Sequence, residues 1–243
     1  MSPYISLLLL LLLALFGSSQ AGCPDTPAEP GPCSCVDASG FEAIYIICSS
    51  GTLQEVMAAV RDVNMEIFEL QITGVEMATL PHDAFAGVSI RRMSLPGNKI
   101  RRITAHAFRG LEDSLEFLSL YDNELTSMPT KALASLHSLC GLDVGRNRLD
   151  FSNPALFNGL NTLEFVSLRD SYLTAVPADA LASLVGLNDL DLGMNSITDV
   201  DVESFGALRQ QLLTLRLYGN RWVLKFTKYI TQRVKLREYF TTK

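Results

Sequence analysis

The chain of 243 residues lacks the motifs that mark the common enzymes and metal sites. It contains no HExxH, no glycine-rich phosphate loop and no EF-hand spacing. No serine or cysteine forms a known catalytic motif with a histidine, and the three histidines, His82, His106 and His137, all fall on connecting segments of the repeat described below. We therefore expect no catalytic residue, no metal site and no cofactor.

Long apolar runs are also absent, apart from one near the start of the chain. Residues 5–16 form an apolar run of twelve, which is shorter than the roughly 20 residues that cross a bilayer. Ser19 and Ala21 are the small residues that a signal peptidase favours before a cut at Gly22. We expect residues 1–21 to be a signal peptide and the mature chain to be secreted, without a stable membrane anchor. An uncleaved anchor is the alternative, because no lysine or arginine precedes the run.

Positive charge is scarce outside the C-terminal end. The chain has 20 basic and 26 acidic residues, and residues 221–243 hold seven of the basic residues but one acidic residue. This tail therefore carries +6 and the rest of the chain −12, a balance that does not favour a nucleic-acid partner. Either the tail only offsets the acidic body and faces solvent, or it docks on an acidic partner or an anionic surface.

What the sequence does contain is a repeat with a period of 23 to 25 residues. Its clearest copy, LEFLSLYDNEL at 115–125, has leucine at positions 1, 4, 6 and 11 and asparagine at position 9. The seven copies begin at Ile67, Ile90, Leu115, Leu139, Leu163, Leu187 and Leu212. Position 9 is asparagine in five copies, Val75 in the first and Ser171 in the fifth. This is the L-x-x-L-x-L-x-x-N-x-L pattern of a leucine-rich repeat.

A single copy cannot bury its own leucines, so the copies must stack. Leucines two residues apart, such as Leu118 and Leu120, point to the same face of a strand. The asparagine can bond backbone groups that the turning chain leaves unpaired, and a phenylalanine or leucine on each return leg is expected to pack inward from the convex side. We expect one α/β solenoid over residues 66–222, an arc of about seven leucine-rich repeats with a parallel sheet on its concave face.

Four of the five cysteines cluster directly after the expected signal peptide. They are Cys23, Cys33, Cys35 and Cys48, and an even cluster in a secreted chain predicts two disulfides, for which three pairings are possible. A zinc site is the alternative, although one residue between the second and third cysteines is fewer than the usual two to four. Residues 52–63 (TLQEVMAAVRDV) read as an amphipathic helix with a capping box. We expect residues 22–65 to form an N-terminal cap on the solenoid.

The fifth cysteine and the C-terminal end leave further alternatives open. Cys140 lies in the fourth copy and is either a partly covered free thiol or the site of an intermolecular disulfide. Asn220, Arg221 and Trp222 keep the start of the motif that usually closes such solenoids, but its cysteines are missing. One structure that residues 225–240 could form is a short helix over the last repeat. Residues 223–243 are therefore either a cysteine-free cap or a basic tail of a chain shortened relative to longer relatives.

The outward side chains of the predicted sheet suggest a binding site on the fourth repeat. Phe117 and Phe165 at position 3 are expected to stand about 10 Å apart, with only Gly141 between them. Tyr121 and Arg169 at position 7 flank Gly145 in the same way. We call this site the concave notch, with a floor that carries Cys140, Asp143 and Arg146. Aromatic residues and arginine dominate interfaces, so the notch is a candidate anchor for a partner; the alternative is that its aromatic residues pack sideways on each other without a ligand.

The segment CPDTPAEPGPCSC resembles the cysteine-rich N-terminal cap of extracellular leucine-rich repeat proteins. Such caps pair the first cysteine with the third and the second with the fourth, which implies Cys23–Cys35 and Cys33–Cys48. The cap, the helix and the repeats together resemble a group of secreted arthropod proteins named after the non-catalytic subunit of Oplophorus-luciferin 2-monooxygenase. In that luciferase an unrelated small subunit performs the chemistry, so the resemblance implies a binding or stabilising role and transfers no catalytic residue.

Our interpretation is a secreted, non-enzymatic scaffold that binds its partner on the concave face, and an accessory subunit is one such scaffold. The partner is expected to be another secreted protein or an extracellular ligand, and not a nucleic acid. The first alternative is an extracellular matrix or innate-recognition protein that binds glycans or microbial surfaces. The second is an enzyme, which turnover by the pure chain would reveal.

Overall fold

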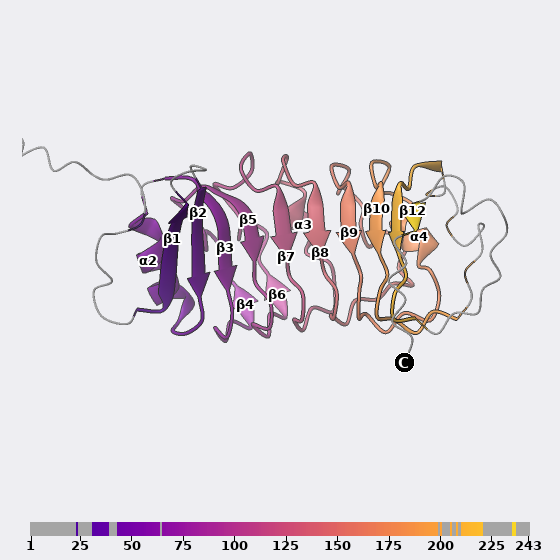
Figure 1. Ribbon diagram of the computed structural model, residues 1–243, viewed down its shortest axis with the longest axis horizontal. Coiled ribbons are helices and arrows are strands. Elements are labelled where there is room, and N and C mark those ends of the chain that lie inside the picture. Colours follow the sequence, from indigo (N-terminus) through magenta and orange to yellow (C-terminus); the bar gives the residue numbers. More distant parts are fainter. Residues whose placement is uncertain are drawn as a thin grey trace, which may run out of the picture.

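The computed structural model has one elongated sheet that runs along the long axis of the molecule (Figure 1). The structure describes Cys23 and residues 31–38, 43–63, 65–198, 200, 205, 208, 210–220 and 235–236. The strand order is β1-β2-β3-β5-β7-β8-β9-β10-β11-β12, and every pair is parallel except β1 with β2. The predicted parallel solenoid is thus confirmed. None of the helices in the described part of the chain is long and apolar enough to cross a membrane.

Each of the seven predicted copies supplies one strand to this sheet. The strands are β3 (Ile67–Ile72), β5 (Ile90–Ser94), β7 (Phe117–Ser119), β8 (Gly141–Asp143), β9 (Phe165–Ser167), β10 (Asp189–Asp191) and β11 (Thr214–Arg216). Their register aligns equal positions of successive copies, so that position 3 of each copy pairs with position 3 of the next. Equal positions therefore form straight rows along the concave face.

The core lies behind the sheet and is built from the repeated apolar positions. Leu118, Leu142, Val166 and Leu190, all at position 4, have no exposed surface. The return legs contribute from the convex side, where the rings of Phe85 and Phe108 stack with centroids 5.9 Å apart. These legs contain the short strands β4 (Thr79–Leu80) and β6 (Arg102–Ile103) and the short helices α3 (Thr130–Leu133) and α4 (Ala178–Leu181). The expected inward packing of the return-leg residues is confirmed.

The asparagine at position 9 joins each repeat to the one before it. Asn147 accepts a hydrogen bond from the Leu125 amide at 3.0 Å and donates to the Leu120 carbonyl at 2.9 Å. Both partners belong to the preceding repeat, and Asn147 itself is 2% exposed. The same bonds recur at the other asparagines of the row. The side chain thus satisfies backbone groups that would otherwise be buried without partners.

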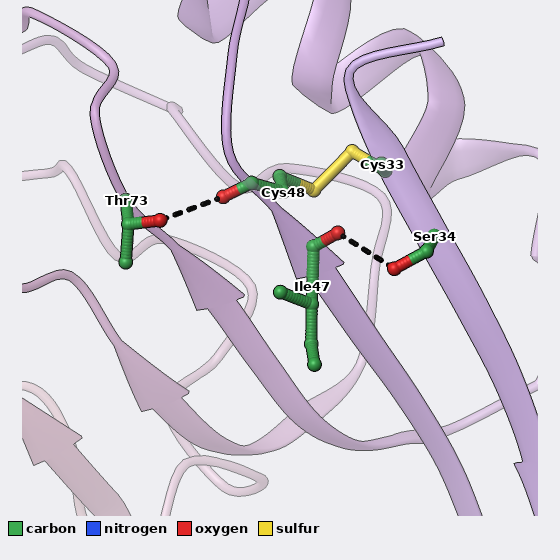
Figure 2. The surroundings of a disulfide bond; sticks show 5 residues. All are labelled: Cys33, Ser34, Ile47, Cys48 and Thr73. Atoms are coloured by element: carbon green, nitrogen blue, oxygen red, sulfur yellow. Dashed lines mark hydrogen bonds between the residues drawn. A yellow bond between two sulfur atoms is a disulfide. The ribbon is translucent and has the colours of Figure 1, made fainter. Parts of the chain in front are cut away.

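The N-terminal cap is a hairpin that covers the first repeat. Strand β1 (Cys33–Ala38) pairs antiparallel with β2 (Ala43–Cys48), and β2 pairs in parallel with β3. The disulfides are Cys23–Cys35 and Cys33–Cys48, which confirms the pairing implied by the resemblance and excludes the zinc alternative. Figure 2 shows the second disulfide between the two strands, with hydrogen bonds from Ser34 to Ile47 and from Thr73 to Cys48 beside it.

Helix α2 (Leu53–Arg61) completes this cap. Thr52 and Glu55 form the predicted capping box, and Val56, Met57 and Val60 are the buried face of the helix. Arg61 donates from Nε to the carbonyl of Ala86 at 3.1 Å. The helix therefore closes the end of the core, as the sequence predicts.

The C-terminal end differs from the expectation of a helix over residues 225–240. The described part of that segment is a strand, β12 (Lys235–Leu236), which pairs in parallel with β11. A strand at this place pairs backbone groups that β11 would otherwise leave open at the sheet edge. The helix prediction is therefore wrong at these residues. The expected signal peptide and the rest of residues 223–243 lie outside the described part of the chain.

We predict that Asn147→Ala lowers the free energy of unfolding by about 3 kcal/mol, because it leaves two buried backbone groups without partners. Urea denaturation measures the change. Asn158→Ala, at an exposed asparagine of a return leg, is the control and is expected to change stability by less than about 0.5 kcal/mol. Equal effects of the two substitutions would contradict this role for position 9.

A second prediction concerns the cap. Replacing Cys33 and Cys48 together by serine is expected to cost about 2–5 kcal/mol, since the cross-link that holds β1 on β2 is lost. The control is Cys140→Ser, which removes a thiol that forms no disulfide and is expected to leave the urea midpoint nearly unchanged. Loss of stability in the control and not in the double variant would rule out the proposed role of the disulfide.

Candidate functional site

Two glycines of the fourth repeat allow side chains of the third and fifth repeats to meet. Gly141 lies under the ring of Phe117, whose Cδ2 would be 2.5 Å from a Cβ atom at this position. At Gly145 an added Cβ would collide with the carbonyl oxygen of Arg169. Neither collision is with a freely movable group, since the ring is packed and the carbonyl belongs to the backbone. The sheet therefore requires glycine at both positions.

The position-3 row forms a continuous stack on the concave face. The rings of Phe117 and Phe165 have centroids 6.0 Å apart and are inclined by 28°. The guanidinium group of Arg92 lies 4.4 Å from the centroid of Phe117, and that of Arg216 lies 5.8 Å from the centroid of Phe165. We call these four residues the aromatic platform. Both rings are half-buried. Each ring also lies against the guanidinium group of one arginine, which is a cation–π arrangement.

The aromatic platform corrects one expectation about the concave notch. The two rings were expected to stand as separate walls about 10 Å apart, with a space above Gly141. In the structure they lean over this glycine and stack with each other. By closing the space above Gly141, the two rings bury apolar surface against each other that would otherwise face solvent. The rings thus pack sideways on each other, and the space above Gly141 is filled rather than hollow.

The position-7 row repeats this arrangement across Gly145. The guanidinium group of Arg169 lies 4.5 Å from the centroid of the Tyr121 ring. Burial alone would lower the pKa of Arg169, but the hydroxyl groups of Tyr121 and Tyr218 more than offset it and keep this pKa above its ordinary value. Arg169 is thus a permanent cation in this row, held between tyrosines from the third and seventh repeats.

The carboxylates of the notch occupy the row between these two. Asp143 and Asp191 at position 5 lie on either side of Ser167 in the register. Asp143 accepts a hydrogen bond from the Gly145 amide at 3.0 Å, and Asp191 accepts one from the Gly193 amide at 2.8 Å. Burial is the main cause that raises the pKa of both carboxyl groups. Their negative charges are therefore only partly compensated within the molecule.

Arg146 of the fourth repeat lies between carboxylates of the third and fifth repeats. It occupies position 8, where the backbone has a positive φ of 51°. Its Nε lies 3.5 Å from a carboxylate oxygen of Asp122 and 3.5 Å from one of Asp170. Cys140, also assigned to the floor, is exposed at position 2, where its thiol donates to the Glu116 carbonyl at 3.4 Å.

Position 8 has a positive φ in all seven repeats. Three repeats place glycine there, at Gly74, Gly97 and Gly219, whereas the third to sixth repeats place Asp122, Arg146, Asp170 and Met194. A side chain in this backbone conformation is strained, and such strain is concentrated at functional sites. The third to sixth repeats therefore carry a side chain at a position where the other three repeats have glycine.

Sequence reasoning placed Phe117 opposite Phe165 and Tyr121 opposite Arg169, each pair across a glycine, and in the structure the members of each pair also contact each other. It missed Arg92, Arg216 and Tyr218 as members of the site. Tyr218 could have been found, because it stands two repeats from Arg169 at position 7 with Gly193 between them. The contacts of the two arginines could not have been predicted, because they depend on the rotamers that these long side chains adopt on the sheet.

A separate cavity of about 410 Å³ lies on the return legs. It is lined by Phe151, Ser152, Ala175, Val176, Pro177, Ala178 and Asp179. Ser152, one of its lining residues, stands where the neighbouring repeats have Met128 and Val176. It shares no residue with the concave notch.

Comparison with known proteins agrees with this architecture. A family model described as leucine rich repeat matches residues 113–170. Leucine-rich repeat-containing protein 3 of Danio rerio is 29% identical over 141 residues, which cover 58% of this chain and 48% of that protein. The chain thus spans about half the length of this relative.

Solved structures are similar over a larger part of the chain. TLR13 in its complex with ssRNA13 has a TM-score of 0.58 and 21% identity, over 77% of this chain and 26% of that one. Human 5T4 (Wnt-activated inhibitory factor 1, trophoblast glycoprotein) has a TM-score of 0.56 and 20% identity, over 88% of this chain and 80% of that one. Identities this low show the fold alone. The chain has the fold of a leucine-rich repeat solenoid with a disulfide-bonded N-terminal cap.

Proposed function

We propose that the chain is a protein-binding scaffold that holds its partner on the concave face of the third to fifth repeats. The observation that carries this proposal is the aromatic platform, in which Phe117 and Phe165 are half-buried and already stacked. Aromatic and arginine side chains supply most of the binding energy at protein interfaces. Because these rings are packed before a partner arrives, little side-chain entropy is lost on binding.

The filled surface supports protein binding over catalysis. Side chains close over Gly141 and Gly145, which leaves a broad, nearly continuous face at the notch. Such a face suits contact with another macromolecule better than enclosure of a small substrate, which pockets bury on most sides.

The proposed place of action is the extracellular space. Two disulfides tie the cap, and disulfides persist in oxidising compartments. The expected signal peptide at residues 1–21 agrees with secretion. An accessory role, in which the chain holds or stabilises a partner that performs the chemistry, is what the resemblance to the arthropod group named after the luciferase non-catalytic subunit implies.

We predict that Phe117→Ala with Phe165→Ala weakens partner capture by more than about tenfold, because the apolar centre of the interface is removed. The measurement is affinity capture from the native extracellular fluid followed by mass spectrometry. Phe151→Ala is the matched control, because this phenylalanine is also half-buried but lies on a return leg.

Circular dichroism must show that both variants are folded. Undiminished capture by the folded double variant would exclude the concave notch as the binding site. Retention of the wild-type chain on glycans, with no protein captured in stoichiometric amount, would instead support the matrix or innate-recognition alternative.

A further inference from the structure

Two histidines meet on the return legs of the first and second repeats. The imidazole rings of His82 and His106 have centroids 5.5 Å apart and are inclined by 38°. Both side chains are exposed, so a solute can reach both rings. The sequence shows no metal motif here, because the two histidines lie one repeat apart in the chain and only the stacking of the repeats brings them together.

The backbone beneath the two rings is held in place. Strands β4 and β6, which precede the two histidines, lie side by side and pair in parallel (Figure 1). The Asp83 amide donates a hydrogen bond to the His106 carbonyl at 3.0 Å. Phe85 and Phe108, which follow the histidines closely in the sequence, are buried and stack in the core. Only side-chain rotations therefore remain to be fixed when a ligand binds both rings.

The separation of the two rings suits a shared metal ion. Zinc binds a histidine nitrogen at about 2.0–2.1 Å and prefers tetrahedral angles, which places the centroids of two bound imidazoles roughly 5 Å apart. The observed separation of 5.5 Å is close to this value. Rotations of the two exposed side chains can therefore direct one nitrogen of each ring at a common ion without moving the backbone.

The charged groups beside the pair do not oppose a cation. Asp83, which follows His82 directly, forms an ion pair with Arg109, whose Nη1 lies 3.2 Å from Oδ1. These two charges offset each other. Among the described residues, no third histidine, cysteine or acidic residue joins the pair in a group that could hold a metal ion. The protein thus offers two ligands, and water or a group of another molecule supplies the remaining ones.

We propose that His82 and His106 chelate one divalent transition-metal ion of the class that prefers imidazole ligands, such as zinc. Two imidazoles on one surface bind an ion more tightly than one does, because the second bond forms within the same molecule. The pair shares no residue with the concave notch. This inference therefore goes beyond the proposed function and does not depend on it.

Calorimetric titration of the full chain with zinc chloride tests the site. All samples carry Cys140→Ser, which removes the exposed thiol as a competing ligand. One zinc ion is expected to bind per chain, whereas magnesium chloride is expected to give no binding, since magnesium prefers oxygen ligands. An affinity for zinc no stronger than that of free imidazole would overturn the proposal.

Substitution of the histidines shows whether the two rings act together. His82→Ala and His106→Ala are each expected to weaken zinc binding more than about tenfold, and the double variant is expected to lose little more than either one, because a chelate needs both rings. His137→Ala is the matched control. That imidazole is also exposed, but its Nδ1 lies 3.2 Å from Oδ1 of Asp113. Its removal is expected to change the affinity less than about twofold.

Two patterns would contradict the chelate. If each single variant bound half as much zinc at an unchanged affinity, the two histidines would be separate sites. If His137→Ala weakened binding as much as His82→Ala, any exposed imidazole of the chain would serve equally well, and the contact between the two rings would have no role.

A stability measurement checks that the ion binds the folded chain at this place. A ligand that binds the folded state raises the free energy of unfolding. Zinc is therefore expected to raise the urea midpoint of the chain with Cys140→Ser and to leave that of the double histidine variant nearly unchanged. An equal rise in both would locate the ion elsewhere and refute the assignment to His82 and His106. The histidine variants are expected to keep the partner captured at the concave notch, so neither outcome decides the proposed function.

Discussion

Every part of the structure depends on one constraint, which is that no repeat can bury its own leucines. Each strand must therefore stack in register on its neighbours, and Leu118, Leu142 and Val166 become fully buried only through this stacking. Asparagines such as Asn147 then satisfy the backbone groups that the stacked turns enclose. The first repeat has no predecessor, so a disulfide-bonded hairpin takes that place.

The same register also builds the candidate site. Equal positions of successive repeats lie side by side, and a glycine in one repeat lets the flanking side chains meet across it. Phe117 and Phe165 meet in this way across Gly141, and Tyr121 and Arg169 across Gly145. The spacing of two strands, about 10 Å, can be spanned by two long side chains that lean toward each other. Repeats with the same backbone structure thus differ in the side chains that meet around Gly141 and Gly145.

The turn after each strand is a further feature that all seven repeats share. The turn after each strand needs a positive φ at position 8, and glycine adopts it at little cost. Arg146 and Met194 adopt it despite their side chains, although glycine occupies this position in three other repeats. Lys99 in the second repeat, away from the notch, adopts a positive φ of 58° as well. The turn itself is therefore common to the whole solenoid, and the repeats differ only in the side chain that it carries.

The sequence by itself determined the solenoid, the seven strands and the inward and outward sides of each, because these follow from periodicity and need no knowledge of distant contacts. The disulfide pairing of the cap was implied by the resemblance of its cysteine pattern to that of known caps. The same periodicity also placed Phe117 and Phe165 on either side of Gly141, because the register aligns equal positions of successive repeats.

Only the tertiary structure decided how that site is filled. The closure of the rings over Gly141, the arginines at both ends of the platform and the burial of Asp191 depend on side-chain rotamers and neighbouring repeats, which a repeat pattern does not encode. The strand at Lys235–Leu236 was decided in the same way. A local pattern there suggests a helix, but the open edge of β11 offers backbone partners that favour a strand.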